Sequence, residues 1–297
     1  MLTDQDISYI KQRGGDPETI RQQLRIFQEG FPYLAISRPA TPGDGIWQPT
    51  DAEIDSRVKA YERSLAHHSI KKFVPASGAA TRMFKALLSY LNECSDTSPY
   101  HQQQRMTEHP DVQTFFDQLT DFAFYEDLTQ AIAKQGTSLN DLIEQGRYAE
   151  VLHYLLKPDG LGYENLPKGL LQFHAYADHC RTAFEEQLVE GANYTRAGSE
   201  TALHFTVSPE HEALFHTHQQ AVEAHHATAQ NTRFNITYSY QHPSTDTIAA
   251  DLNNEPFRDS SGYPVFRPGG HGALLDNLNA VDADVIFIKN VDNVVPD

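Results

Sequence analysis

The feature that most constrains the fold is an alternation of short apolar strands with helical segments. Strand-like runs lie at residues 71–76, 202–207, 234–240 and 285–288, and segments between them space their apolar residues as helices do. Strands that alternate with helices predict a mostly parallel sheet that helices cover on both faces. The sequence therefore predicts an α/β fold.

The residues before the first strand predict an N-terminal helical arm. Asp16 followed by Pro17 is typical of a helix start, because Asp accepts hydrogen bonds from the first turn and Pro needs no donor there. Thr50 and Glu53 have the spacing of a capping box, which predicts a further helix that ends near His67.

Two domains are expected from this pattern. Residues 1–69 form the arm, and residues 70–297 form an α/β domain with a mainly helical insertion at about 95–160. Only nine residues follow the apolar run at 285–288. Because a domain seldom ends so soon after a buried strand, the sequence is expected to be the N-terminal part of a longer protein, with the end of the α/β domain missing.

The charge balance excludes one class of partner. Forty acidic against 23 basic residues give a formal charge of -17, which repels DNA, RNA and anionic lipid. A local cluster of cations can still bind a small anion.

The sequence has no membrane or secretion signal. No apolar run approaches the roughly 20 residues of a membrane helix, and the N-terminus has no apolar signal segment. Two cysteines suit a reducing compartment. We therefore expect a cytoplasmic protein that binds neither membranes nor nucleic acid polymers.

A run of small residues follows the first strand and ends at Arg82. Its members are Ala76, Ser77, Gly78, Ala79, Ala80 and Thr81. A strand, a small-residue turn and a helix together present backbone N–H groups to phosphate, and an Arg guanidinium can bind two phosphate oxygens. The alternative is a tight turn with a solvated Arg.

Lys168 lies between Pro167 and Gly169, so its backbone is positioned rather than flexible. Its ammonium would serve as a point charge for phosphate. The alternative is a surface lysine in a turn.

Two further segments can contribute to a ligand site. Gly269, Gly270, His271 and Gly272 form a loop that can lie flat against a base or ribose, although a glycine loop alone is weak evidence. Asp292 follows the last strand, at the edge of the sheet where open α/β folds bind ligands. It can hold Mg²⁺, a cation that prefers oxygen ligands, or it can merely cap a turn.

The histidines at 211, 218 and 225 share one face of a predicted helix. Two turns, about 10.5 Å, separate each pair, which is too far for one ion. A solvated polar face is therefore preferred to a zinc site.

Taken in order, these segments resemble those of the UDP-sugar pyrophosphorylases. Pro75–Arg82 resembles their small-residue loop ending in Thr-Arg, and Pro167–Gly169 their Pro-Lys-Gly. Their strand closed by Thr and Ser is similar to Leu203–Pro209. Their glycine loop is similar to Pro268–Gly272, and their Val-Asp-Asn segment is similar to Val291–Asn293. The whole chain is also similar to a bacterial family of domains of unknown function that looks distantly related to these enzymes.

This resemblance implies a Rossmann-like fold of the GT-A type, with a mixed, mostly parallel sheet. It implies transfer of a nucleotidyl group from UTP, or another nucleoside triphosphate, to a sugar 1-phosphate with release of pyrophosphate. Arg82 and Lys168 would be the catalytic cations, residues 76–81 and 269–272 would bind the nucleotide, and Asp292 would bind Mg²⁺.

The sequence departs from that pattern at Ser77 and Ala80, where the relatives usually carry glycine. A methyl group at a position of close approach would crowd the phosphate. The alternative function is therefore a non-catalytic module that binds or senses a nucleotide or sugar nucleotide. A structural interaction domain would suit residues 95–160 but leaves the motifs unexplained.

Overall fold

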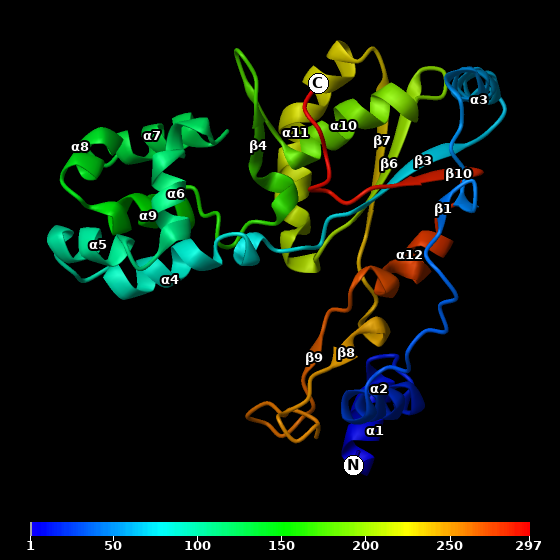
Figure 1. Cartoon of the computed structure of the whole chain (residues 1–297), viewed down its shortest axis with the longest axis horizontal. Coiled ribbons are helices and arrows are strands. Elements are labelled where there is room, and N and C mark those ends of the chain that lie inside the picture. The colour runs from blue at the N-terminus through cyan, green and yellow to red at the C-terminus, as the bar shows by residue number, and fades with distance from the viewer. Residues whose placement is uncertain (1) are drawn as a thin grey trace. The chain divides into compact units, whose positions relative to one another are not determined.

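The computed structural model describes residues 2–297, which form two compact units (Figure 1). The first unit contains the residues up to Ile70 together with Ser239–Ile286. The second contains Lys71–Tyr238 together with Phe287–Asp297. Residues 239–286, which the sequence pattern placed in the α/β domain, thus group with the N-terminal segment.

The first unit combines short helices with small strand pairs. Its elements are α1 (Asp4–Gln12), α2 (Pro17–Glu29), β1 (Thr41–Pro42), β2 (Gly45–Ile46), α3 (Asp51–Ser64), β8 (Thr247–Ile248), β9 (Phe266–Arg267) and α12 (Leu275–Asn279). The two predicted helix starts are confirmed, since the Asp16 carboxylate accepts the Glu18 and Thr19 N–H groups and Thr50 forms its capping box. The second of these helices ends at Ser64, three residues before the predicted end.

A four-stranded parallel sheet with flanking helices organises the second unit. Its strands are β3 (Ile70–Pro75), β6 (Glu200–Thr206), β7 (Arg233–Ser239) and β10 (Val285–Ile288), in the spatial order β10-β3-β6-β7. These are the four predicted strands to within two residues, so the α/β class and the parallel sheet are confirmed. In chain order, β6 lies beside β3 and β7 lies beside β6. The last strand, β10, then lies on the other side of β3 (Figure 1).

Two helices pack on this sheet through aromatic contacts. They are α10 (Ala183–Tyr194) and α11 (Glu212–Ala229). Phe184 of α10 lies 4.8 Å from Phe205 of β6 and 6.0 Å from Phe215 of α11, measured between ring centroids. Since all three rings are buried, this contact fixes α10 and α11 against the strand ends.

The segment predicted as an insertion, about 95–160, is mainly helical. It contains α5 (Pro99–Met106), α6 (Pro110–Asp117), α7 (Tyr125–Ala133), α8 (Leu139–Glu144) and α9 (Tyr148–Leu156). These helices share one hydrophobic core with the preceding α4 (Lys85–Cys94). A 3₁₀ turn (Ala80–Arg82) precedes α4, which therefore begins two residues later than the first apolar residue of the predicted helix, Met83.

The region after the insertion was not assigned from the sequence. It forms a 3₁₀ turn (Lys168–Leu170), an antiparallel hairpin of β4 (Gln172–Ala175) with β5 (Cys180–Thr182), and then α10. In residues 2–297, no helix has the length and apolar character needed to cross a membrane.

Candidate functional site

The order of the strands marks one edge of the sheet as a candidate binding site. Because β6 and β7 lie on one side of β3 and β10 on the other, the chain changes direction between β3 and β10. Ligands of open α/β sheets bind outside the carboxyl ends of strands at such a point. The Val291 N–H donates to the Pro75 carbonyl oxygen at 3.0 Å, so the two carboxyl ends lie side by side.

Two of the predicted segments are joined by backbone hydrogen bonds at this edge. The Lys168 N–H donates to the Gly78 carbonyl at 3.1 Å, and the Ala80 N–H donates to the Leu166 carbonyl at 3.2 Å. Ala79 and Pro167 thereby form an antiparallel bridge. The small-residue loop and the Pro-Lys-Gly segment are thus one structure, although almost 90 residues separate them in the chain.

The loop offers some of its backbone donors to a ligand and uses others within the fold. The Ala76 N–H donates to Thr206 O, and the Ala80 N–H is bonded as described, so neither is available to a phosphate. The N–H groups of Ser77, Gly78 and Ala79 have no hydrogen-bond partner in the described part of the chain. These three N–H groups remain as candidate hydrogen-bond donors to a phosphate.

Ala80 does not crowd the site in the way the sequence comparison implied. Its side chain is completely buried and belongs to the hydrophobic core of the helical insertion. Its methyl group therefore packs inward. At Gly78, by contrast, an added Cβ would meet open space.

Arg82 ends the 3₁₀ turn and is exposed. Its guanidinium makes no hydrogen bond or ion pair with any other residue from 2 to 297. An exposed Arg that follows a loop with unpaired backbone N–H groups is suited to binding an anion.

Lys168 and Asp292 form an ion pair with 2.6 Å between Nζ and Oδ2. Gly169 makes this approach possible, since a Cβ there would lie 2.8 Å from the Phe215 ring and 3.1 Å from Val291 Cγ2. Any side chain at this position would force either the turn or the buried Phe215 ring to shift. The predicted phosphate cation and the predicted metal ligand are therefore brought together.

Gln187 holds the segment that carries Asp292. Its side chain is buried, and Nε2 donates to the carbonyl oxygens of Asn290 at 2.8 Å and Val291 at 3.2 Å. Sequence reasoning missed this residue, because α10 was not predicted and no short motif contains it.

The donor set at the sheet edge fits a magnesium ion only together with a bound phosphate. The described residues contain no cluster of three or more His, Cys, Asp or Glu side chains that could hold a metal. Mg²⁺ in phosphate sites takes one or two carboxylates, and phosphate and water oxygens complete its shell. Asp292 can supply one carboxylate, and a phosphate that attracts Lys168 would release it from the ion pair.

The glycine loop belongs to the first unit and lines a cavity there. Gly269, Gly270 and Gly272 border a space of about 410 Å³ together with Thr19 and Gln23 of α2. Gly269 is tightly packed, with 3.1 Å from an added Cβ to the Thr245 carbonyl oxygen, whereas Gly270 and Gly272 face open space. His271 is exposed at the start of a 3₁₀ turn (His271–Leu274). The role of these four residues in nucleotide binding stays a prediction.

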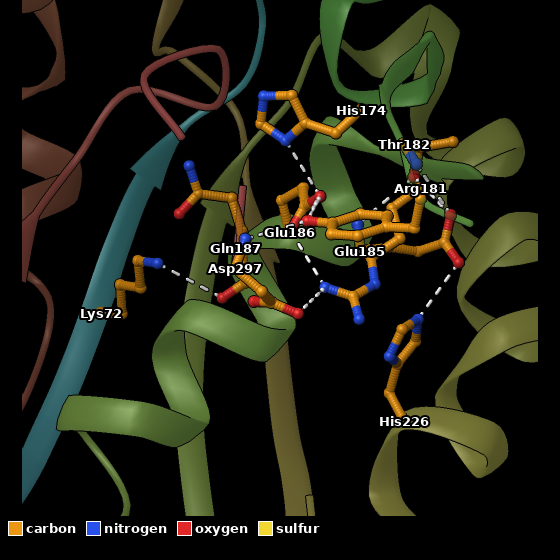
Figure 2. A network of polar contacts seen from close by, with 10 residues as sticks. Lys72, His174, Arg181, Thr182, Glu185, Glu186, Gln187, His226 and Asp297 are labelled. Carbon is orange, nitrogen blue, oxygen red and sulfur yellow. Dashed lines mark hydrogen bonds and ion pairs between the residues drawn. The ribbon is translucent and has the colours of Figure 1, made fainter. Parts of the chain in front are cut away.

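A second polar network lies beneath the β4–β5 hairpin. Figure 2 shows His174 and Arg181 directed at Glu186, a side chain that is 98% buried, and Asp297 paired with the same Arg181 guanidinium nitrogen as Glu186. The distances are 3.0 Å for His174 Nδ1–Glu186 Oε1 and 2.7 Å for Arg181–Asp297. The Tyr176 hydroxyl also donates to Glu186 at 2.7 Å. Both carboxylate oxygens of Glu186 are paired, so we interpret the network as structural.

Of the histidines expected on a solvated face, His218 is instead partly buried and lies 3.5 Å from Glu185 Oε2. His226, which was not assigned to that face, is buried and lies 3.1 Å from Glu185 Oε1. Burial alone would raise the pKa of Glu185, but hydrogen bonds from both histidines and from Thr182 lower it well below its usual range. The heptad spacing could not show that α10 presents a carboxylate to this face.

Lys72 is fully buried on β3 (Figure 2). Its Nζ lies 3.3 Å from the Gln187 carbonyl oxygen and 3.5 Å from Glu190, a carboxylate that Lys289 contacts at 2.7 Å. Burial lowers the pKa of Lys72 to about 8, and the Glu190 charge opposes this change only in part.

Comparison with known proteins assigns the family. No curated protein and no solved structure matches the chain. A family model described as "Domain of unknown function (DUF4301)" matches residues 3–297. The chain therefore belongs to the DUF4301 family.

Proposed function

We propose that this protein is a nucleotidyltransferase with a GT-A-type Rossmann-like domain. It transfers a nucleotidyl group from UTP, or another nucleoside triphosphate, to a sugar 1-phosphate and releases pyrophosphate. The observation that carries the proposal is the meeting of three predicted segments, at 76–82, 167–169 and 291–293, where the strand order reverses.

The chain's own groups have distinct tasks in this reaction. A sugar phosphate oxygen attacks the α-phosphorus, the bond to the β-phosphate bridging oxygen breaks, and pyrophosphate leaves. Arg82 and the N–H groups of residues 77–79 would hold the β- and γ-phosphates, and Lys168 an α-phosphate oxygen. Asp292 would hold Mg²⁺, which neutralises charge on the phosphates. Positioning and electrostatic stabilisation then supply most of the rate.

The competing proposal is a non-catalytic module that binds a nucleotide or sugar nucleotide. The Lys168–Asp292 ion pair favours it, because each group neutralises the other until a ligand separates them. The buried methyl group of Ala80 removes one objection to catalysis, since it does not face the ligand.

An assay for pyrophosphate release separates the two proposals. The full chain is incubated with Mg²⁺, UTP and a panel of sugar 1-phosphates, and Lys168→Ala is compared with Lys134→Ala. Lys134 is an exposed lysine at the end of α7 and serves as the matched control. A loss on the order of 10²–10³ in rate for Lys168→Ala alone supports the enzyme.

Thermal stabilisation by UTP without turnover supports the binding module instead. If neither turnover nor stabilisation occurs with any nucleotide, both proposals are wrong.

A further inference from the structure

Residues that follow the proposed phosphate site in the chain line an aromatic cavity. It has a volume of about 410 Å³, within the range of small-molecule sites. Met83 and Phe84, which follow Arg82 directly, form one part of its wall, and Leu171 and Gln172 form another, three and four residues after Lys168.

The cavity wall is suited to a flat ring. Phe115, Phe122, Phe124, Tyr163 and Phe173 complete the aromatic part of the lining. Phe122 and Phe124 are stacked, with centroids 5.0 Å apart and planes 11° apart, and Phe115 lies 5.2 Å from Phe122. Because Phe122 is only partly buried, part of its surface remains for a ligand.

Gln172 supplies a hydrogen-bond acceptor in this wall. Its Nε2 donates to Asp127 Oδ2 at 3.3 Å, and since a carboxylate can only accept, this contact fixes which end of the amide is oxygen. Oε1 is buried and has no partner among the described residues. A buried unpaired carbonyl costs about 1–3 kcal/mol. The terminal torsion of Gln is broad, so a rotation that gives up the Nε2 contact with Asp127 would turn the oxygen toward a ligand.

We propose that this cavity binds the nucleobase of the nucleotide whose phosphates Arg82 and Lys168 hold. The base would stack on Phe122 and donate a ring N–H to Gln172 Oε1. An aliphatic chain would leave that oxygen unpaired, and the exposed Asp111 at the border disfavours an anionic ring. The inference rests on the proposed function for the phosphate site, and it places base recognition in the second unit rather than on the glycine loop of the first.

The test measures binding of UTP, uridine and inorganic tripolyphosphate to the full chain by calorimetry and ligand-observed NMR. We expect Phe122→Leu to weaken the binding of UTP and of uridine by about 5- to 150-fold, the range for loss of one base stack. The affinity for tripolyphosphate should stay unchanged. Phe116→Leu is the matched control, because Phe116 is a partly buried Phe of the same helical group that does not line the cavity. Equal effects of the two variants would overturn the inference.

A second measurement does not depend on how well Phe122→Leu folds. The wild type should bind UTP about tenfold or more tightly than N3-methyl-UTP, because methylation removes the N–H group that would donate to Gln172 Oε1. Gln172→Leu should abolish this preference. A preference that survives Gln172→Leu, or that is absent in the wild type, contradicts the assignment.

The outcomes keep the two proposals apart. If Arg82→Ala leaves tripolyphosphate binding unchanged while uridine binding still depends on Phe122, the phosphate site is wrong and the base cavity stands. If Arg82→Ala abolishes tripolyphosphate binding but UTP binds no more tightly than tripolyphosphate, the phosphate site stands and the base cavity is wrong.

Discussion

Replacing the buried Lys72 with Met should change how stability depends on pH. The pKa of Lys72 is about 8 in the folded protein, against an ordinary value of 10.5. Because the folded pKa is the lower one, the unfolded chain binds more protons between these values, and stability rises with pH in that window. At about 1.4 kcal/mol per pKa unit, the charged form costs the folded state about 3 kcal/mol below pH 8.

Most of this cost disappears before pH 10. From pH 7.5 to pH 10, the wild type should gain about 2 kcal/mol relative to Lys72→Met. At pH 7, Lys72→Met should be at least as stable as the wild type, because an apolar replacement of a buried ion is often neutral or stabilising. Glu190 keeps a partner in the variant, since Lys289 contacts it at 2.7 Å.

The assay is urea unfolding followed by far-UV circular dichroism at pH 7.5, 8.5, 9.3 and 10. The comparison with the variant is essential, because the pKa of the Cys94 thiol is raised by burial and its stabilisation is lost in the same range. Lys71→Met is the matched control, a partly exposed lysine on the same strand. If the wild type and Lys72→Met respond to pH in parallel, the reasoning about burial is refuted.

Three further predictions concern the site and its supports. Gly169→Ala should destabilise the protein by about 1–3 kcal/mol through overpacking and weaken UTP binding, whereas Gly78→Ala, with open space at its Cβ, should leave the melting temperature unchanged. Glu186→Gln should cost about 1–3 kcal/mol in urea unfolding, because the amide weakens the contact with the partly buried Arg181, which keeps Asp297 as a charged partner; a loss below 1 kcal/mol would contradict a structural role. The pKa of Glu185 is lowered in the fold, so its ionised carboxylate stabilises the protein above pH about 4.5, and this stabilisation is lost as pH falls further. Glu185→Gln should therefore lose less stability than the wild type between pH 5 and 3. An equal loss in the two proteins would contradict this.

The sequence by itself determined which elements form. The apolar runs of β3, β6, β7 and β10 were readable because each is short, apolar and bounded by turn residues. Asp16 and Thr50 identified two helix starts, since capping depends on a few adjacent residues. The same local signals did not reveal α10, and they gave helix ends less accurately than helix starts.

Tertiary structure decided which of the predicted site residues meet. The pairing of Lys168 with Asp292 spans 124 residues and requires the order of β3 and β10 as well as a glycine at 169. Whether Ala80 faces the ligand or the core depends on the helices that cover it. Gln187, Glu186 and the aromatic cavity carry no sequence motif, because each arises from contacts between segments far apart in the chain. Local spacing fixes local hydrogen bonds, whereas burial and long-range packing fix the geometry of the site.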